Sequence, residues 1–243
     1  DLRGLTTEQL HALADEIREA LLRKLSVHGG HIGPNLGMVE ATIALHRVFD
    51  SPKDKIIYDV SHQSYVHKML TGRRKAFLDT AAYDEVSGYT NPQESEHDHF
   101  TIGHTSTSVS LACGLAKARD LRGGSENVIA VIGDGSLSGG EAYEGLSNAG
   151  EAGTNLIVVV NDNEMSIAEN HGGLYANLRA TIRTLGDPNL HAVPHLATIN
   201  DQTDDLGAGY HPNLRGQCKM AAAVIPYIAT LAGWPMPQDR PIR

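Results

Sequence analysis

Residues 128–165, VIAVIGDGSLSGGEAYEGLSNAGEAGTNLIVVVNDNEM, contain two short apolar runs, each followed directly by polar residues. The runs Val128–Ile132 and Leu156–Val160 are rich in β-branched residues, which is typical of strands buried on both faces of a parallel sheet. Between them, Gly139–Ala152 has the length and composition of a crossover helix. Such a strand–helix–strand unit brings the carboxyl ends of both strands to one edge of the sheet. The stretch therefore predicts an α/β fold.

The residues that follow the two strands predict a site for a metal ion and a diphosphate. Asp134 lies within Gly133-Asp134-Gly135 after the first strand, and Asn163 lies in the turn after the second. The glycines allow backbone N–H groups to approach an anion closely, beside the start of a helix. Mg²⁺ prefers hard oxygen ligands and keeps substrate phosphates in its coordination sphere. We therefore expect Asp134 and Asn163 to converge on one Mg²⁺ ion.

Nucleotide binding is the main alternative for a Gly-rich turn between a strand and a helix. The dinucleotide motif G-x-G-x-x-G is not matched, because Ser138 stands where the third glycine is required. The sequence also contains no G-x-x-x-x-G-K-[ST] phosphate loop. Taken alone, Asp134-Gly135 is most often a tight turn and 161–163 a loop. Their occurrence together favours the metal–diphosphate site.

The composition of the chain argues against several other classes of protein. A formal net charge of −9, with no basic stripe, argues against nucleic acid or an anionic membrane as a partner. The longest apolar runs are about five residues, far short of the ~20 that span a bilayer. The two cysteines, Cys113 and Cys218, have no C-x-x-C partner, which indicates a reducing, cytoplasmic location.

Hydrophobic periodicity outside residues 128–165 predicts further helices and one more strand. Thr6 and Gln9 have the spacing of a capping box, and the apolar residues that follow repeat at helical spacing through Leu25. Further helices are expected at residues 36–48, 63–70 and 105–119, and a strand at 56–60. This alternation predicts a doubly wound, mostly parallel sheet with helices on both faces.

Several longer stretches resemble one family of thiamine-diphosphate enzymes. The gap of about thirty residues between Asp134 and Asn163 is typical of the cofactor motif of that class. The surrounding sequence resembles the N-terminal domain of the 1-deoxy-D-xylulose-5-phosphate synthases, in GGHIGPNLGMVEATIALHRVFDSPKDKIIYDVSHQSYVHKMLTGR (29–73), SGYTNPQESEHD (87–98), GHTSTSVSLACGLAKARDL (103–121) and NDNEMSIAENHGG (161–173). Transketolases share the fold and cofactor, but DVSHQSYVHKMLTGR and NDNEMSI resemble the synthases.

The resemblance implies that the chain binds thiamine diphosphate together with Mg²⁺. By resemblance, Asp134, Asn163 and the backbone carbonyl of Met165 hold the metal ion. GHTSTS is expected to place hydroxyl and free N–H groups at a helix start, where they can meet a diphosphate. The residues implied to contact the cofactor are His62, His104, Ser106, Gly133, Gly135, Ser136 and Asn163.

Two histidines are implied to act in catalysis. His31 in GGHIG and His62 in SHQSY match positions near the cofactor in this family. Imidazole can shuttle a proton near neutral pH, so we expect both residues to take part in proton transfer with the substrate. The alternative is structural, because a histidine beside small residues usually hydrogen-bonds a backbone carbonyl.

Two other polar groups are expected to lie outside the site. The HDH stretch at residues 97–99, with Glu94 and Glu96 nearby, contains metal-ligand types, but the resemblance favours a solvated loop. Arg73 and Arg74 are expected to be surface or structural residues, with substrate-phosphate binding as the alternative.

The resemblance implies the activity of 1-deoxy-D-xylulose-5-phosphate synthase, a transferase of two-carbon units. These enzymes condense pyruvate with glyceraldehyde 3-phosphate with loss of CO₂, and their product serves isoprenoid, thiamine and pyridoxal synthesis. The glutamate that activates thiamine diphosphate lies in a second, pyrimidine-binding domain, for which the 63 residues after position 180 are too few. We therefore expect the chain to hold half of an active site and to be inactive alone. It is then a fragment, a transketolase-like small subunit of a split enzyme, or a non-catalytic remnant that binds cofactor or forms oligomers.

The chain is expected to divide at about residue 180. Residues 1–180 form the thiamine-diphosphate and Mg²⁺ domain, and residues 181–243 form a divergent, loosely ordered tail that holds seven of the ten prolines. A cleft wall around residues 29–37 and 103–110 is expected to expose an apolar patch and to favour a homo-oligomer, in the simplest case a homodimer. The expected patch residues are Ile32, Leu36, Ile102 and Val109.

Overall fold

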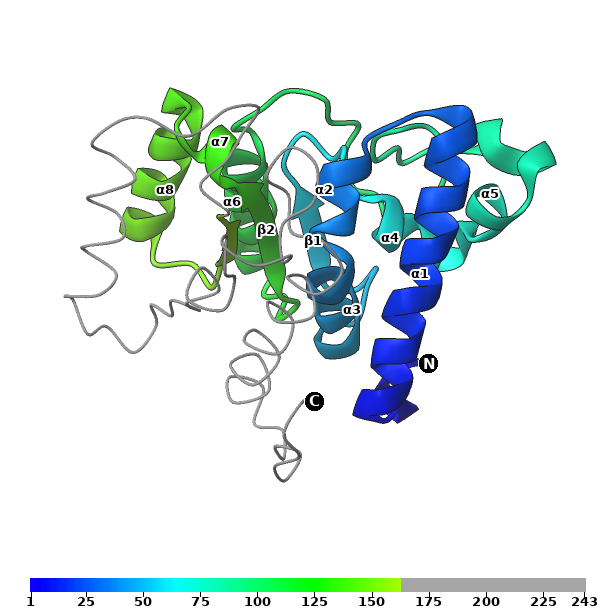
Figure 1. Cartoon of the computed structure of the whole chain (residues 1–243). Helices are drawn as coiled ribbons and strands as arrows, with labels where there is room; N and C mark the ends of the chain where they lie inside the picture. The colour runs from blue at the N-terminus through cyan, green and yellow to red at the C-terminus, as the bar shows by residue number, and fades with distance from the viewer. Residues whose placement is uncertain (163–243) are drawn as a thin grey trace, which may run out of the picture.

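A computed structural model describes residues 1–162 of the chain (Figure 1). Its sheet contains β1 (Lys55–Tyr58), β2 (Val128–Gly133) and β3 (Ile157–Asn161) in the order β1-β2-β3, and all pairs are parallel. Both apolar runs of the opening stretch therefore form strands as predicted. The predicted ligands Asn163 and Met165, the boundary near residue 180 and the Pro-rich tail lie outside the described residues.

Helices cover both faces of this sheet, as the alternation of elements predicts. Successive residues of a strand point to opposite faces. On one face, Ile56, Tyr58, Ile129 and Val131 pack with Leu45 of α3 (Val39–Val48). On the other face, Ile57, Ala130 and Ile132 pack with residues of α6 (Ser108–Leu121) and α8 (Gly140–Ala152). α6 and α8 are the crossover helices that precede β2 and β3 (Figure 1).

A third hydrophobic cluster joins α1 (Thr7–His28) to the neighbouring helices. The capping box of Thr6 and Gln9 is present, and it satisfies two backbone N–H groups at the start of α1. Leu10, Ile17 and Leu21 on its buried face pack with residues of α3, α4 (Tyr65–Lys68) and α5 (Lys75–Leu78). The sheet is thus packed on α3, and α3 in turn on α1.

Three predicted helices have different bounds in the structure. The helix expected at 36–48 is divided into α2 (Ile32–Leu36) and α3, and the one expected at 63–70 is α4 followed by a π-helical turn at Met69–Arg73. α6 begins three residues later than expected, because Ser106 has a φ of 71° and cannot continue a helix. The remaining short helices are Leu2–Gly4, Thr80–Glu85 and α7 (Asp134–Leu137).

The two apolar strands differ in burial, although both were expected to be buried on both faces of the sheet. Val128–Ile132 of β2 is buried throughout, as predicted. β3 is only partly buried, and Val160 is 38% exposed. Among the described strands β3 pairs with β2 alone, so one of its edges lacks a strand neighbour. Residues 1–162 contain no helix with the length and apolar character needed to cross a bilayer.

The expected apolar patch on the cleft wall is only partly present. Ile32 is 45% exposed, but Ile102 is buried and Val109 is fully enclosed between α6 and the sheet. Two of the four expected patch residues therefore belong to the core. The patch was overestimated because the start of α6 turns its apolar side chains inward, against β1 and β2.

Candidate functional site at the carboxyl edge of the sheet

Acidic side chains follow all three strands at the same edge of the sheet. Asp59 follows β1, Asp134 follows β2 and Asp162 follows β3. Gly133 pairs with Asn161 in the parallel register, so the residues after β2 and β3 leave the sheet at the same level. Ligands of open α/β sheets bind at this edge. The predicted convergence of Asp134 and Asn163 stays a prediction, because Asn163 lies outside the described residues, and the register places Asp134 beside the start of the turn after β3.

Asp134 is buried, at 5% exposure, and is the first residue of α7. A turn residue that follows a strand is usually exposed, and Asp134 is not. The reason is that α7 starts directly after Gly133, the last residue of β2, and turns the side chain against the protein. The N–H of Gly135 donates to the carboxylate at 2.9 Å. Because this N–H is already bonded, its predicted contact with diphosphate stays a prediction.

The metal site is only partly described by the structure. Asn163 and Met165 lie outside residues 1–162, so the three predicted ligands are not placed together. Within residues 1–162 no group of three or more His, Cys, Asp or Glu side chains is arranged to hold a metal ion. The predicted set uses one carboxylate, one amide and one carbonyl, and it stays a prediction.

Asp59 organises the start of α6 and was not predicted from the sequence. Its buried carboxylate accepts N–H groups from Ser106 and Ser108, each at 2.9 Å. These are the N–H groups expected to be free for a diphosphate. A carboxylate at a helix N-terminus is favoured by the free N–H groups and by the helix dipole. The strand expected at 56–60 would have included Asp59, but β1 ends at Tyr58. An acidic residue near the end of an apolar run, in DVSHQ, is the signal that would have identified it.

Ser106 joins the turn before α6 to the turn after β2. Its hydroxyl donates to the carbonyl of Ser136 at 2.7 Å. A Cβ on Gly139 would lie 2.0 Å from the Ser106 Oγ atom, so only glycine permits this approach. Ser106 is buried and both its N–H and its hydroxyl are bonded within the chain. The structure gives Ser106 a role in shaping the site, and its direct contact with diphosphate remains a prediction.

His104 is exposed at the start of the same turn. Its Nδ1 lies 2.7 Å from the carbonyl oxygen of Thr105. A carbonyl only accepts, so Nδ1 carries the hydrogen and Nε2 is the acceptor in the neutral ring. A neutral His104 therefore cannot donate to a phosphate through Nε2, whereas the protonated ring can.

The structure brings His31 and His62 together. Their ring centroids are 5.2 Å apart in an edge-to-face arrangement, although 30 residues separate them in the chain. Burial lowers the pKa of His62 to about 4, the neighbouring His31 adds to this, and Asp59 opposes it. His62 is therefore neutral at pH 7, and its buried Nδ1 has no hydrogen-bond partner among the described residues.

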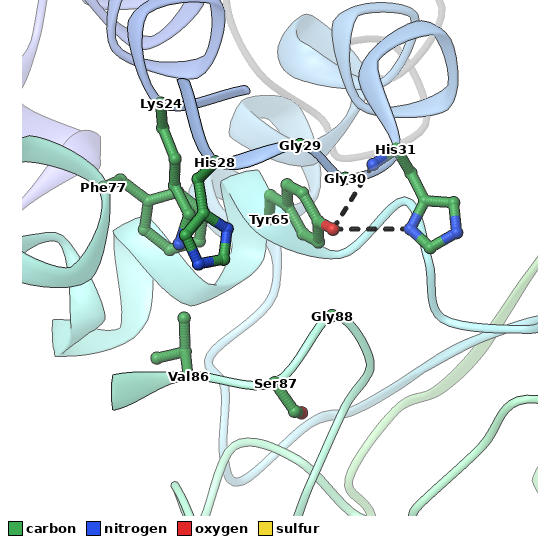
Figure 2. Close-up of a pocket in the computed structure, with 10 residues that line it drawn as sticks. All are labelled: Lys24, His28, Gly29, Gly30, His31, Tyr65, Phe77, Val86, Ser87 and Gly88. Carbon is green, nitrogen blue, oxygen red and sulfur yellow. Dashed lines mark hydrogen bonds between the residues drawn. The ribbon is translucent and has the colours of Figure 1, made fainter. Parts of the chain in front are cut away.

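A cavity of about 260 Å³ lies beside His31 (Figure 2). Lys24 lines it, but the Lys24 Nζ donates to the carbonyls of Ala76 and Tyr83 at 2.8 and 3.0 Å and lies 4.4 Å from the centre of the Phe77 ring. Burial lowers the pKa of this ammonium. The Lys24 ammonium thus ties α1 to α5 and to the short helix that follows it. The other residues around it are His28, Gly29, Gly30, Tyr65, Val86, Ser87 and Gly88.

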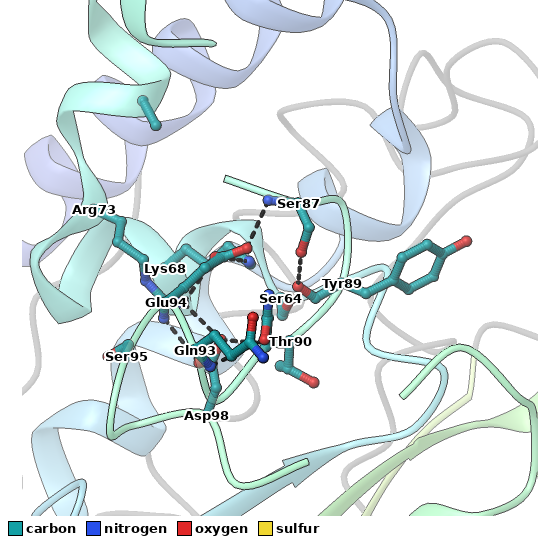
Figure 3. A network of polar contacts seen from close by, with 12 residues as sticks. Ser64, Lys68, Arg73, Ser87, Tyr89, Thr90, Gln93, Glu94, Ser95 and Asp98 are labelled. Carbon is teal, nitrogen blue, oxygen red and sulfur yellow. Dashed lines mark hydrogen bonds and ion pairs between the residues drawn. The ribbon is translucent and has the colours of Figure 1, made fainter. Parts of the chain in front are cut away.

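The HDH stretch is not the solvated loop that was expected. Asp98 is 3% exposed and bonds to His67 at 3.0 Å. It also bonds to both terminal nitrogens of Arg73, at 2.6 and 2.8 Å (Figure 3). Burial alone would raise the pKa of Asp98, but the hydrogen bonds from His67, Arg73 and the Asn91 N–H outweigh burial and hold it well below its usual range. Arg73 is structural, one of the two roles expected for it.

This buried network fixes the loop at residues 87–98 beside the histidine pair. Glu94 bonds to the buried Lys68 and accepts the N–H of Ser87 at 2.8 Å (Figure 3). The loop places the Tyr89 ring 5.7 Å from the His31 ring. Residues remote from the strand ends thus determine one wall around His31.

The described fold and site define a class: α/β domains with a wholly parallel sheet, helices on both faces and polar residues at the carboxyl edge. The structure resembles that of a transketolase mutant from Pichia stipitis with a TM-score of 0.62, over 93% of this chain and 35% of that one. At 18% sequence identity this likeness concerns the fold alone.

Sequence comparison identifies the family. The family model described as 1-deoxy-D-xylulose-5-phosphate synthase matches residues 1–196, and the chain belongs to this family. The 1-deoxy-D-xylulose-5-phosphate synthase of Desulfitobacterium hafniense is 57% identical over 178 residues, 73% of this chain and 28% of that protein. Those of Symbiobacterium thermophilum and Geobacter metallireducens are 55% and 57% identical over 194 and 182 residues, covering 80% and 75% of this chain and 30% and 29% of those proteins. The chain spans less than a third of the length of these relatives.

Proposed function

We propose that this chain provides the diphosphate- and Mg²⁺-binding part of a 1-deoxy-D-xylulose-5-phosphate synthase. The reaction is the thiamine-diphosphate-dependent condensation of pyruvate with glyceraldehyde 3-phosphate, with loss of CO₂. Membership of the family supports the reaction. The observation that carries the assignment of the site is the buried Asp134 carboxylate, held where β2 ends beside β3.

The described residues fit such a cofactor. The carboxylate of Asp134 follows β2 beside the end of β3 and is a hard oxygen ligand of the kind that Mg²⁺ prefers. Gly133, Gly135 and Gly139 keep Cβ atoms away from the turns around Asp134, and at Gly139 a Cβ would collide with Ser106. We propose that Asp134, Asn163 and the Met165 carbonyl hold Mg²⁺.

The cofactor-binding and catalytic roles extend this proposal to the turns around the metal. Gly133, Gly135 and Ser136 line the diphosphate, with Ser106 holding their turn in place and His104 near its end. When bound, thiamine diphosphate supplies an electron sink for carbon–carbon bond cleavage and formation. His62, neutral at pH 7, accepts or returns a proton next to the substrate, and His31 is its partner in this transfer.

Catalysis needs parts of the enzyme beyond those described. Because the chain spans less than a third of its relatives, we propose that a pyrimidine-binding domain completes the site. A homo-oligomer, in the simplest case a homodimer in the cytoplasm, is the proposed assembly. We expect the purified 243-residue chain to show no pyruvate decarboxylation; carboligation by it would contradict this.

Calorimetric titration with thiamine diphosphate and Mg²⁺ tests the proposed site. Asp134→Asn keeps the shape of the buried side chain and removes its charge, so we expect cofactor affinity to fall at least tenfold. Glu144→Gln, an exposed change on α8, is the matched control and should bind as the unchanged chain does. Unaltered affinity in a folded Asp134→Asn chain, checked by circular dichroism, would refute the assignment.

A further inference from the structure

Asn35 connects the two loops that carry His31 and His62. It is fully buried, at 0% exposure, in the short helix α2. Its side-chain amide donates to the backbone carbonyls of His31 at 2.6 Å and His62 at 2.8 Å. Its side-chain oxygen accepts the N–H of Tyr65 at 2.9 Å. One side chain therefore fixes three backbone segments with both its donors and its acceptor.

Tyr65 fixes the ring of His31. Its hydroxyl oxygen lies 3.3 Å from Nδ1 and 3.4 Å from the backbone nitrogen of His31 (Figure 2). The backbone N–H can only donate, so the hydroxyl accepts from it. Burial raises the pKa of the phenol, which keeps its hydrogen, and among the described hydrogen bonds only Nδ1 is an acceptor for that hydrogen. This arrangement favours a neutral His31 ring that carries its own hydrogen on Nε2.

We propose that Asn35 and Tyr65 are positioning residues that hold His31 and His62 in one arrangement, with the hydrogen of His31 on Nε2. Asn35 sets the distance between the two backbones, and Tyr65 sets the orientation and tautomer of the His31 ring. The value of this arrangement for catalysis rests on the proposed function, whereas the arrangement itself can be measured without cofactor or substrate.

Glycines in the surrounding backbone leave space for the Tyr65 hydroxyl beside His31. A Cβ at Gly30 would lie 3.0 Å from the Tyr65 hydroxyl and 2.7 Å from Leu25, and one at Gly88 would lie 3.4 Å from the same hydroxyl. Gly30 also has a φ of 128°, which strongly favours glycine. The two loops thus approach the hydroxyl closely, with no side chain between it and His31.

Nuclear magnetic resonance of the full chain with ¹⁵N-labelled histidine tests the proposal, because nitrogen shifts report both tautomer and pKa. His31→Gln and His62→Gln variants assign the two rings among the 13 histidines. In Tyr65→Phe we expect His31 to change from the Nε2–H tautomer to a mixture. In Asn35→Ser we expect the pKa of His62 to rise by roughly 1 unit or more toward its ordinary value, as the loops separate and water reaches the ring.

Two control variants separate positioning from general destabilisation. Asn127→Ser removes an amide that bonds Asp54 at 3.0 Å, next to the start of β2, and Tyr143→Phe removes an exposed hydroxyl on α8. Both controls should leave the tautomer of His31 and the pKa of His62 unchanged. Unchanged rings in Tyr65→Phe, or equal changes in the controls, would overturn the proposal. If Asn35→Ser does not fold, the Tyr65→Phe result decides.

Failure of the proposed function gives a different result. If the chain binds no thiamine diphosphate in calorimetry but shows the expected histidine changes, the positioning role of Asn35 and Tyr65 is supported and the proposed cofactor is refuted. If the chain binds the cofactor but the tautomer of His31 is unchanged in Tyr65→Phe, the proposed cofactor is supported and the positioning role is refuted.

Discussion

Two buried carboxylates of this domain are stabilised in different ways. Asp59, at the edge of the sheet, is held by backbone N–H groups of the turn before α6. Asp98, in the loop beside the histidine pair, is held mainly by the side chains of Arg73 and His67. Backbone N–H groups are neutral, and they are present at every position except proline. The side-chain donors of Arg73 and His67 are a buried charge and a buried ring, which lose a hydrogen-bond acceptor when the carboxylate is removed. The two sites should therefore respond differently to loss of the acid.

Removing Asp98 should have the largest effect on stability. In Asp98→Ala, the guanidinium of Arg73 loses its two short bonds to the buried carboxylate and keeps a 3.3 Å contact with Glu94. Loss of one partner of a buried pair costs about 3–5 kcal/mol. The free energy of unfolding from urea titration measures this change. Arg73→Met with Asp98→Ala should recover part of the loss. A cost below about 1 kcal/mol would show that water replaces the carboxylate.

The imidazoles around Asp98 should make the domain sensitive to acid. Burial lowers the pKa of His46 to about 3, and the nearby His67 adds to this. The unfolded chain takes up this proton below about pH 6.5 and the folded chain does not, so stability is complete above that pH and falls as the pH decreases toward 3. Between pH 7 and 5, His46→Gln should reduce the loss of unfolding free energy by about 2 kcal/mol. An equal pH dependence in both chains would contradict this.

Replacing Asp59 should have a smaller effect than replacing Asp98. Asp59→Asn keeps one acceptor oxygen for the N–H groups of Ser106 and Ser108 but loses the charge at the helix start, so we expect a cost of about 1–2 kcal/mol. The same urea titration applies, with Asp98→Asn measured in parallel. A larger cost for Asp59→Asn than for Asp98→Asn would reverse the comparison.

An exposed ion pair should have the smallest effect on the free energy of unfolding among these substitutions. Glu19 and Arg23 on α1 form a pair one helical turn apart, and both side chains are more than half exposed. Exposed pairs of this kind contribute about 0.3–0.5 kcal/mol, so Glu19→Gln should change the free energy of unfolding by no more than that. A change above about 1 kcal/mol would show that the pair is linked to the core.

The edge of the sheet was predictable because its signals are local. An apolar run followed at once by GDG defines a strand and a turn within ten residues, and β2 and Asp134 are found there. The burial of Asp134 was not predictable, because it depends on α7 starting without a connecting loop. Likewise, the capping box at Thr6 predicted the start of α1, while the division of the helix expected at 36–48 depends on how α2 meets the SHQ loop.

The network around Asp98 was not predictable, because its partners are distant in the chain. His67 and Asp98 are 31 positions apart, and Lys68 and Glu94 are 26 positions apart. A stretch such as ESEHD has the composition of a surface loop, and the burial of its Asp98 depends on the positions of Lys68 and Arg73 on the α4 side. Polar residues that neutralise one another across the fold leave no pattern in a single sequence. Asn35 escaped notice for the same reason.

The bonds of Asp59 also have a consequence for the order of folding. Its carboxylate contacts N–H groups 47 and 49 positions further along the chain, with α4, α5 and the loop at 87–98 in between. Closing so long a segment costs chain entropy before any contact compensates for it, so such contacts form late. During refolding, helical circular dichroism should therefore recover before the turn ahead of α6 is assembled. The proposed affinity for a diphosphate ligand should then be among the last properties to return.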